Sequence, residues 1–164
     1  MPTSQHAIIL LDNTVLSNFA LIGRSDLLVT LWPSCATTFE ARQEFITGLK
    51  TGKFQNDPWN DLPIYELTPN ERENANRLSN LLGLGERSCI AIANSRNGMI
   101  VTDDRKARQV ARGMGILVTG TLGVLTLDIE MGIVPLDEAN QLLRQMIEFG
   151  YRSPVTDLQS LLQK

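Results

Sequence analysis

The sequence predicts an α/β fold in which a mostly parallel central sheet is covered by helices on both faces. Short apolar segments alternate with longer segments of helical periodicity along the chain. The first of these, residues 7–11, is apolar at every position, which is typical of a strand buried on both faces. With 164 residues, 43% of them hydrophobic and 20% charged, the chain is long enough for one domain with a substantial core.

The first half of the chain begins with a strand at residues 7–12, where Asp12 ends the apolar run. Residues 13–23 follow as a predicted helix, because Val15 and Phe19 lie on one side and Gly23 is a typical helix stop. The next predicted elements are a helix at 25–32, a strand at 34–37, a helix at 38–52, a loop at 56–63 and a strand at 64–67.

A capping box opens the second half. Thr68, Pro69 and Glu71 have the spacing of an N-cap, a first helical residue and an N3 residue, which predicts a helix that runs to Leu82. The later predicted elements are a helix at 83–98, a strand at 99–102, a helix at 105–113, a strand at 116–119, and helices at 120–132, 136–150 and 153–163.

We find no internal repeat, low-complexity segment or interdomain linker, so residues 1–164 are predicted to form a single domain. The first six residues are expected to be flexible. Residues from about 135 to 164 are expected to pack as a helical appendage, with Ser153 as the cap and Pro154 as the first residue of the last helix.

Composition excludes several kinds of function. The net charge is −3 and the pI about 5.2, so any contact with nucleic acid must depend on a local basic patch. Cys35 and Cys89 lie among apolar neighbours and are expected to be reduced core thiols. The only histidine, His6, precedes the first strand, which disfavours histidine-dependent nucleophiles and histidine-rich metal sites. The apolar run 6–11 is too short to span a membrane, and we expect a cytoplasmic protein.

Acidic residues follow two of the predicted strands. Asp12 ends the first strand, and Asp103 and Asp104 end the strand at 99–102. Binding sites in open α/β sheets form beyond the carboxyl ends of the strands, so we expect these acids to share one crevice. A single aspartate at such a place often only caps a helix, but a cap needs one carboxylate and the sequence supplies two at this turn.

Two glutamates can reach the same edge. Glu86 opens the helix at 83–98, and Glu44 lies in the helix that follows the second strand; each is also compatible with an ordinary helical charge. Several carboxylates in one crevice cannot all stay ionised without a cation. Oxygen ligands without histidine or cysteine favour Mg²⁺ or Mn²⁺, and such an ion suits phosphodiester hydrolysis.

Four segments of the chain resemble PIN-domain ribonucleases, and in particular the VapC-type toxins of prokaryotic toxin–antitoxin pairs. They are "LLDNTVLSNFA" at 10–20, "TTFEARQEFITG" at 37–48, "LGLGERSCIAIA" at 82–93 and "IVTDDRKARQVARGMGILVTGTLGVL" at 100–125. The tail at 132–154 also resembles the C-terminal helices of one subfamily, so the resemblance spans about residues 7 to 155.

The resemblance implies a Rossmann-like three-layer α/β/α sandwich and a metal-dependent endoribonuclease. It implies that the catalytic acids are Asp12, Glu44, Glu86, Asp103 and Asp104, and that all of these except Glu44 bind the metal. Glu44 is chosen over Glu40 because it stands six residues after Thr38 and four before Gly48. Ser88 replaces an acid that the subfamily often has. Most of the family has one acid at the Thr-x-Asp turn, so the choice between Asp103 and Asp104 stays open.

Polar and basic residues surround these acids. Thr14, Asn18 and Thr102 are expected to bind the acids or water, although local backbone bonding is an alternative. Arg105 and Lys106 are the candidate RNA-binding residues, and Arg108 and Arg112 follow on the same helix; an exposed helix face is the alternative. With 5% aromatic residues, we expect no platform for base stacking.

The resemblance also implies partners: an RNA substrate, a small antitoxin whose segment fills the acidic groove, and a second copy in a homodimer, with no membrane. A PIN-like interaction module without activity is the non-enzymatic alternative. A receiver domain or an aspartyl phosphatase fits less well. Thr14 stands where the phosphatase needs a second aspartate, and no lysine follows the strand at 116–119.

Overall fold

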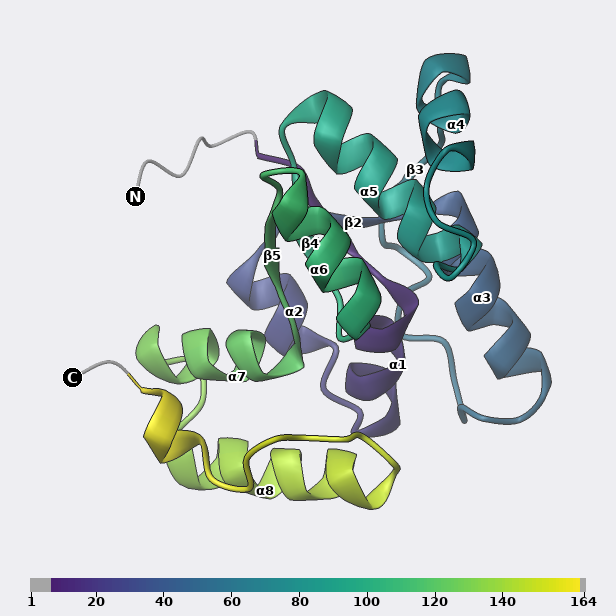
Figure 1. The fold of residues 1–164 in the computed structure, drawn as a ribbon. Coiled ribbons are helices and arrows are strands. Elements are labelled where there is room, and N and C mark those ends of the chain that lie inside the picture. Colours follow the sequence, from purple (N-terminus) through teal and green to yellow (C-terminus); the bar gives the residue numbers. More distant parts are fainter. Residues whose placement is uncertain (1–6, 163–164) are drawn as a thin grey trace.

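The computed structural model describes residues 7–162 and contains a five-stranded, all-parallel sheet with the order β3-β2-β1-β4-β5 (Figure 1). The predicted fold class is confirmed. The expected flexible segment 1–6 lies outside the described residues. The strands are β1 Ile9–Leu11, β2 Cys35–Thr38, β3 Ile64–Tyr65, β4 Met99–Val101 and β5 Leu117–Thr119.

Strand β1 is the centre of the sheet, because Leu10 pairs with Ala36 of β2 on one side and with Ile100 of β4 on the other. A central parallel strand is covered on both faces, which explains why its residues are apolar without alternation. The parallel strands all end at one edge of the sheet. Asp12 and the residues that follow Val101 therefore lie at the same edge.

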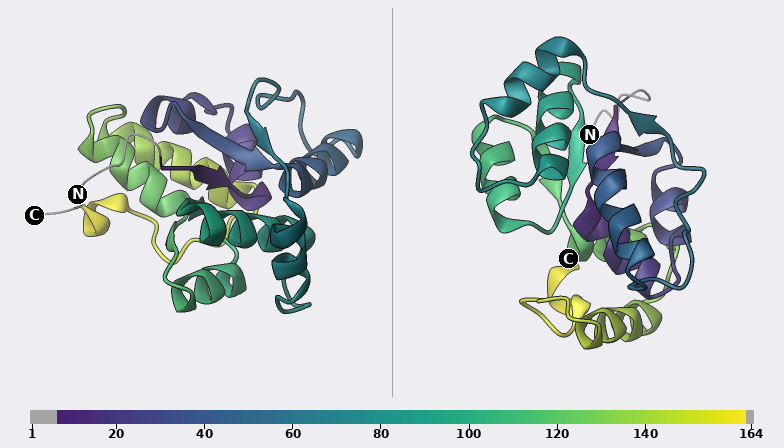
Figure 2. Two further views of the ribbon diagram at one scale, coloured as in Figure 1. Left: turned by 90° about the horizontal axis from the view of Figure 1, so that it is seen from above. Right: turned by 90° about the vertical axis from the view of Figure 1, so that its right-hand side faces the viewer.

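Helices cover both faces of the sheet. They are α1 Asn13–Leu21, α2 Asp26–Leu31, α3 Phe39–Lys50, α4 Pro69–Asn76, α5 Leu84–Arg96, α6 Arg105–Gly113, α7 Thr121–Glu130, α8 Leu136–Glu148 and the 3₁₀-helix η1 Leu158–Leu161. Leu11 and Val101 face a core shared with α1, α2, α7 and α8, whereas Leu10 and Ile100 face a core shared with α5 and α6. Figure 2 shows α5 and α6 on one side of the strands and α2 on the other.

The C-terminal helices belong to the first of these cores. Leu143 and Met146 of α8 and Leu158 of η1 are buried in the same cluster as Phe19 of α1. Both thiols, at Cys35 and Cys89, are buried and free, as predicted. Within residues 7–162, no helix has the length and apolar character needed to cross a membrane.

The helix predicted to run to Leu82 ends at Asn76 instead. The capping box at its start is confirmed: Thr68 accepts a hydrogen bond from the Glu71 backbone, and the Glu71 carboxylate accepts one from the Thr68 backbone. Beyond Asn76, the hydroxyl of Ser79 accepts a hydrogen bond from the Leu81 backbone at 3.2 Å. Serine competes in this way with helical bonding, and the turn replaces the last part of the predicted helix.

The helix predicted at 153–163 is also wrong, and only the short η1 forms there. Ser153 accepts a hydrogen bond from the Val155 backbone, two residues on, rather than capping a helix. Asp157 caps η1 through the Gln159 backbone, and Asn140 of α8 accepts a hydrogen bond from the Leu158 backbone at 2.8 Å. Side chains of the segment itself and Asn140 of α8 thus take the backbone donors that a longer helix would use. The strand predicted at 64–67 is likewise shorter, because only Ile64–Tyr65 pairs with β2.

Asp128 of α7 is a buried acid outside the carboxyl edge of the sheet. It is 0% exposed, and neither carboxylate oxygen has a hydrogen-bond partner among the described residues. Its pKa is raised from the usual 3.8 to about 7, chiefly by burial and then by the charge of Asp26, while the charge of Arg24 opposes the shift. The folded protein therefore favours the protonated form of this carboxyl.

We expect Asp128 to make the protein less stable as the pH rises. The folded state keeps this proton up to about pH 7, whereas the unfolded chain loses it near 3.8, so the free energy of unfolding falls between these values. Asp128→Asn cannot lose a proton, and its stability relative to the natural chain should grow by at least ~1 kcal/mol from about pH 5 to about pH 8. Urea unfolding at several pH values measures this; a constant difference between the two chains would contradict it.

Candidate functional site

Asp12 is the centre of the site, directly after β1 at the carboxyl edge of the sheet. It is 1% exposed, and its Oδ2 accepts hydrogen bonds from Thr102 Oγ1 at 2.7 Å and from Thr14 Oγ1 at 3.3 Å. Its Oδ1 has no partner in the described part of the chain, and its side chain makes no capping bond to α1. The capping explanation of this aspartate is therefore wrong, and a buried oxygen is left for something else.

Two glutamates act electrostatically on Asp12. The pKa of Asp12 is raised from 3.8 to about 7, chiefly by burial and then by the charges of Glu86 and Glu44, while the Thr102 hydrogen bond opposes the shift. The pKa of Glu44 is raised by burial and then by the charge of Glu86. Glu86 itself has a buried Oε2 without a partner among residues 7–162. The carboxylates of Asp12 after β1, Glu44 of α3 and Glu86 of α5 thus lie close enough to repel one another.

Glycines allow α5 to bring Glu86 so close to α3. A Cβ on Gly85 would lie 3.0 Å from Glu44 Cδ and 3.2 Å from Ala41 Cα, and one on Gly83 would lie 2.5 Å from Glu86 Oε2. Without these side chains, the Gly85 N–H donates to Glu44 Oε2 at 3.4 Å. The carboxylate of Glu44 therefore lies at the positive N-terminus of α5.

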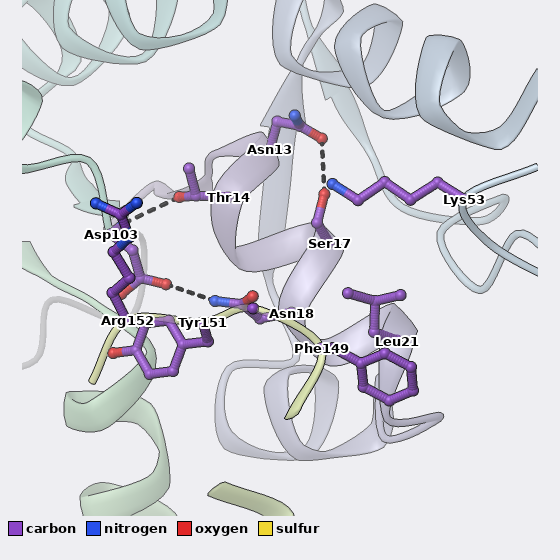
Figure 3. Close-up of a pocket in the computed structure, with 11 residues that line it drawn as sticks. Asn13, Thr14, Ser17, Asn18, Leu21, Lys53, Asp103, Phe149, Tyr151 and Arg152 are labelled. Atoms are coloured by element: carbon purple, nitrogen blue, oxygen red, sulfur yellow. Dashed lines mark hydrogen bonds between the residues drawn. The ribbon is translucent and has the colours of Figure 1, made fainter. Parts of the chain in front are cut away.

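Asp103 connects the end of β4 to two other elements. Its carboxylate accepts hydrogen bonds from the Thr121 backbone at 2.8 Å and from the Thr121 hydroxyl. It also accepts one from Asn18 Nδ2 at 2.9 Å (Figure 3). Burial raises its pKa, and the bonds from Thr121 and the charge of Arg108 oppose the shift. Both oxygens are thus occupied in fixing α1 and α7 to the edge of the sheet.

Asp104 caps α6, because its Oδ1 accepts a hydrogen bond from the Ala107 backbone at 2.7 Å. It is also connected to Asp12 through Thr102, whose Oγ1 donates to Asp12 and accepts from the Asp104 backbone at 3.2 Å. On the other side, Thr14 Oγ1 accepts from the Asp103 backbone at 2.9 Å. The expected contacts of Thr14, Asn18 and Thr102 with the acids are all present.

The donors at this edge suit a hard divalent cation. Asp12 Oδ1 and Glu86 Oε2 are buried oxygens without partners, and their charges need compensation. Among residues 7–162, no three acidic, cysteine or histidine side chains surround one point closely enough to hold a metal ion by themselves. Mg²⁺ keeps several waters and often binds one or two carboxylates, so the pair of oxygens fits such an ion with water as the remaining ligands.

A family model described as a PIN domain matches residues 8–164. The chain belongs to the PIN-domain family. No curated protein matches the chain significantly. PIN domains are generally nucleases that use divalent metals, so membership supports hydrolysis of phosphodiester bonds.

The basic residues of α6 face two different sides of that helix. Arg105, Arg108 and Arg112 of α6 line a groove of about 1250 Å³, together with Arg152 of the C-terminal segment. Lys106 is exposed but does not line that groove. Of the two predicted RNA-binding residues, the structure therefore brings only Arg105 to the groove.

Sequence reasoning missed Thr121 and Arg152, and it placed Glu40 second to Glu44. Thr121 holds Asp103, and its position after Gly120 in the quoted "GTLG" stretch was a usable signal. Glu40 has a buried Oε1 without a partner in the described chain, and its charge also raises the pKa of Glu44. Arg152 had no signal in the sequence, because nothing local shows where the C-terminal segment returns.

We expect Mg²⁺ to stabilise this PIN domain through Asp12. At about pH 8 the carboxyl is ionised and repelled, so millimolar Mg²⁺ should raise the Tm by at least ~3 °C over EDTA. At about pH 5 a proton occupies Asp12, whose pKa is about 7, and the rise should be smaller. Differential scanning calorimetry measures both.

Two variants make this test specific. Asp12→Asn should lose most of the rise in Tm. Asp128→Asn changes a buried acid whose pKa is also about 7 but which lies in α7, so it should keep the full rise. An equal rise in Asp12→Asn and the natural chain would show that Mg²⁺ binds elsewhere.

Proposed function

We propose that this PIN domain is a divalent-metal-dependent endoribonuclease that hydrolyses RNA phosphodiesters. The observation that carries the proposal is the buried Asp12 oxygen without a partner, repelled by Glu86 and Glu44 at the carboxyl edge of the sheet. A fold gains no stability from such an arrangement, because an uncompensated buried charge is costly. The unpaired oxygen and the crowded carboxylates are explained if the site binds a cation and a phosphate.

Each acid has a separate role in the proposal. Asp12 and Glu86 hold Mg²⁺ or Mn²⁺ through their partnerless oxygens, and Asp104 contributes the oxygen that its helix cap does not use. A bound ion of this kind would lower the pKa of the attacking water and stabilise the charge on the phosphate. Glu44, whose pKa is raised by burial and by the charge of Glu86, would be the general base that accepts a proton from the attacking water.

Asp103 is a positioning residue in this proposal. Its carboxylate already accepts three hydrogen bonds from Thr121 and Asn18, so it has little capacity for a metal ion. By holding α1 and α7 against β4, it keeps the Thr14 and Thr102 hydroxyls in place around Asp12.

We expect Mg²⁺- or Mn²⁺-dependent cleavage of RNA that EDTA abolishes. Asp12→Asn should lower the cleavage rate at least ~100-fold, because the neutral amide cannot hold the cation. A gel assay with a labelled RNA of mixed sequence measures it, and a DNA of the same sequence tests the choice of RNA.

Asp104→Ser separates capping from chemistry at the Thr-x-Asp turn. Serine is also a favourable N-cap, so the free energy of unfolding should stay within ~0.5 kcal/mol while cleavage falls at least ~10-fold. If Asp12→Asn cleaves as fast as the natural chain, the assignment of the site is wrong. If no RNA or DNA is cleaved with either metal, the inactive interaction module is the better description.

We further propose, from the resemblance to VapC-type proteins, that the nuclease is a toxin inhibited by a small antitoxin whose segment enters the acidic groove. Expression of the natural chain alone should then slow bacterial growth, and Asp12→Asn should remove the effect because it removes cleavage. Growth curves of the two strains at equal protein levels measure this. Equal growth of both would contradict the toxin role. The homodimer and the cytoplasmic location stay predictions.

A further inference from the structure

A basic groove runs between α6, α7 and the C-terminal segment. Its volume is about 1250 Å³, and its charged lining consists of four arginines, Arg105, Arg108, Arg112 and Arg152, against two acids, Asp103 and Glu130. The whole chain carries a net charge of −3, so this positive lining is a local feature. Small-molecule sites are typically ~300–1,000 Å³, and the larger volume favours an extended ligand.

The arginines of α6 form a row along the groove. Arg105, Arg108 and Arg112 are separated by three and four residues, which places them on one face of the helix. The row is ~10 Å long at 1.5 Å per residue. Lys106 is on another face, is exposed and lies outside the groove. A row of spaced guanidinium groups suits a ligand with repeating negative charges.

The groove leads to the acidic edge of the sheet. Asp103, Tyr151 and Arg152 line both this groove and a smaller pocket of about 350 Å³ that also contains Thr14 and Asn18. Figure 3 shows Tyr151 and Arg152 beside Asp103 and Asn18, although they come from the opposite end of the chain. A ligand in the groove would therefore approach the residues around Asp12.

Of the four arginines, Arg108 has a structural role beside Asp103. A Cβ on Gly120 would collide with Arg108 Nη1 and lie 2.5 Å from Asp103 Oδ1, so glycine is needed for these two groups to lie side by side. Arg105, Arg112 and Arg152 are exposed side chains and can contact a ligand without loss of this arrangement.

We propose that the groove binds the backbone of single-stranded RNA through Arg105, Arg112 and Arg152, so that the C-terminal segment forms part of the substrate site. The half-buried ring of Tyr151 offers a base a stacking surface at the end of the groove nearest Asp103. This inference rests on the proposed nuclease function and names the path by which its substrate reaches the acids.

Binding of a labelled single-stranded RNA to the full chain in EDTA tests the groove without cleavage. Arg112→Ala and Arg152→Ala should each weaken binding ~3–10-fold and reduce the slope of log Kd against log salt concentration by ~0.7, as expected for one lost contact to a single strand. Lys106→Ala is the matched control. It removes one positive charge from the same helix outside the groove, and it should change Kd less than ~2-fold.

Several outcomes would overturn the proposal. The proposal is wrong if Lys106→Ala weakens RNA binding as much as the arginine variants do. It is also wrong if neither Arg112→Ala nor Arg152→Ala changes the Kd, or if duplex RNA binds as tightly as single-stranded RNA. Displacement of the RNA by poly-glutamate at equal charge concentration would favour an acidic protein segment as the occupant. If RNA binding depends on the arginines but Mg²⁺ or Mn²⁺ produces no cleavage, the nuclease proposal is wrong and the proposal that the groove binds RNA is still supported.

Discussion

The parallel pairing of β1 with β4 is the constraint on which the rest of this PIN domain depends. The Asp12 backbone donates to the Val101 carbonyl at 3.0 Å, which sets the two strand ends side by side. Thr102 then reaches the Asp12 carboxylate at 2.7 Å and accepts a hydrogen bond from the Asp104 backbone. One threonine hydroxyl therefore joins the first acid of the chain to the turn that carries two more. Side chains alternate between the two faces of the sheet along each strand. By this alternation, the side chains of Asp12 and Thr102 both lie on the face covered by α5, the helix that carries Glu86.

A comparison of two buried acids, Asp12 and Asp128, shows why a missing partner alone does not make a site. Asp12 and Asp128 are both buried, both have partnerless oxygens, and the pKa of each is about 7. Asp128 lies in α7 within a helical layer, where protonation removes its charge at little cost. Asp12 lies at the carboxyl edge of a parallel sheet, next to two more carboxylates that α3 and α5 bring in. Glycines at 83 and 85 allow that approach, so the local backbone of α5 is adapted to crowd the acids together.

The adjacent aspartates at 103 and 104 have different tasks because the chain turns between them. Asp103 is bonded to Thr121 and Asn18, and it holds together elements that lie on one face of the sheet. Asp104 begins α6 on the other face and is linked to Asp12 through Thr102. The basic helix that Asp104 caps then carries its arginine row away from the acids, along the groove that the C-terminal segment completes. The acidic edge and the basic groove therefore meet at this one turn.

The sequence by itself determined the layers of the fold, the strand edge that carries Asp12 and the turn at 103–104, and the capping box at Thr68. These depend on apolar periodicity and on hydrogen bonds between residues a few positions apart, which the sequence displays directly. Only the tertiary structure decided where α4 ends, which oxygens lack partners, and that Asp103 is bonded to Asn18, 85 residues away. It also decided that Arg152 and Tyr151 lie beside α6, whereas Lys106 faces elsewhere. Burial and contacts between distant residues arise only when the layers pack, so no local pattern in the sequence could have shown them.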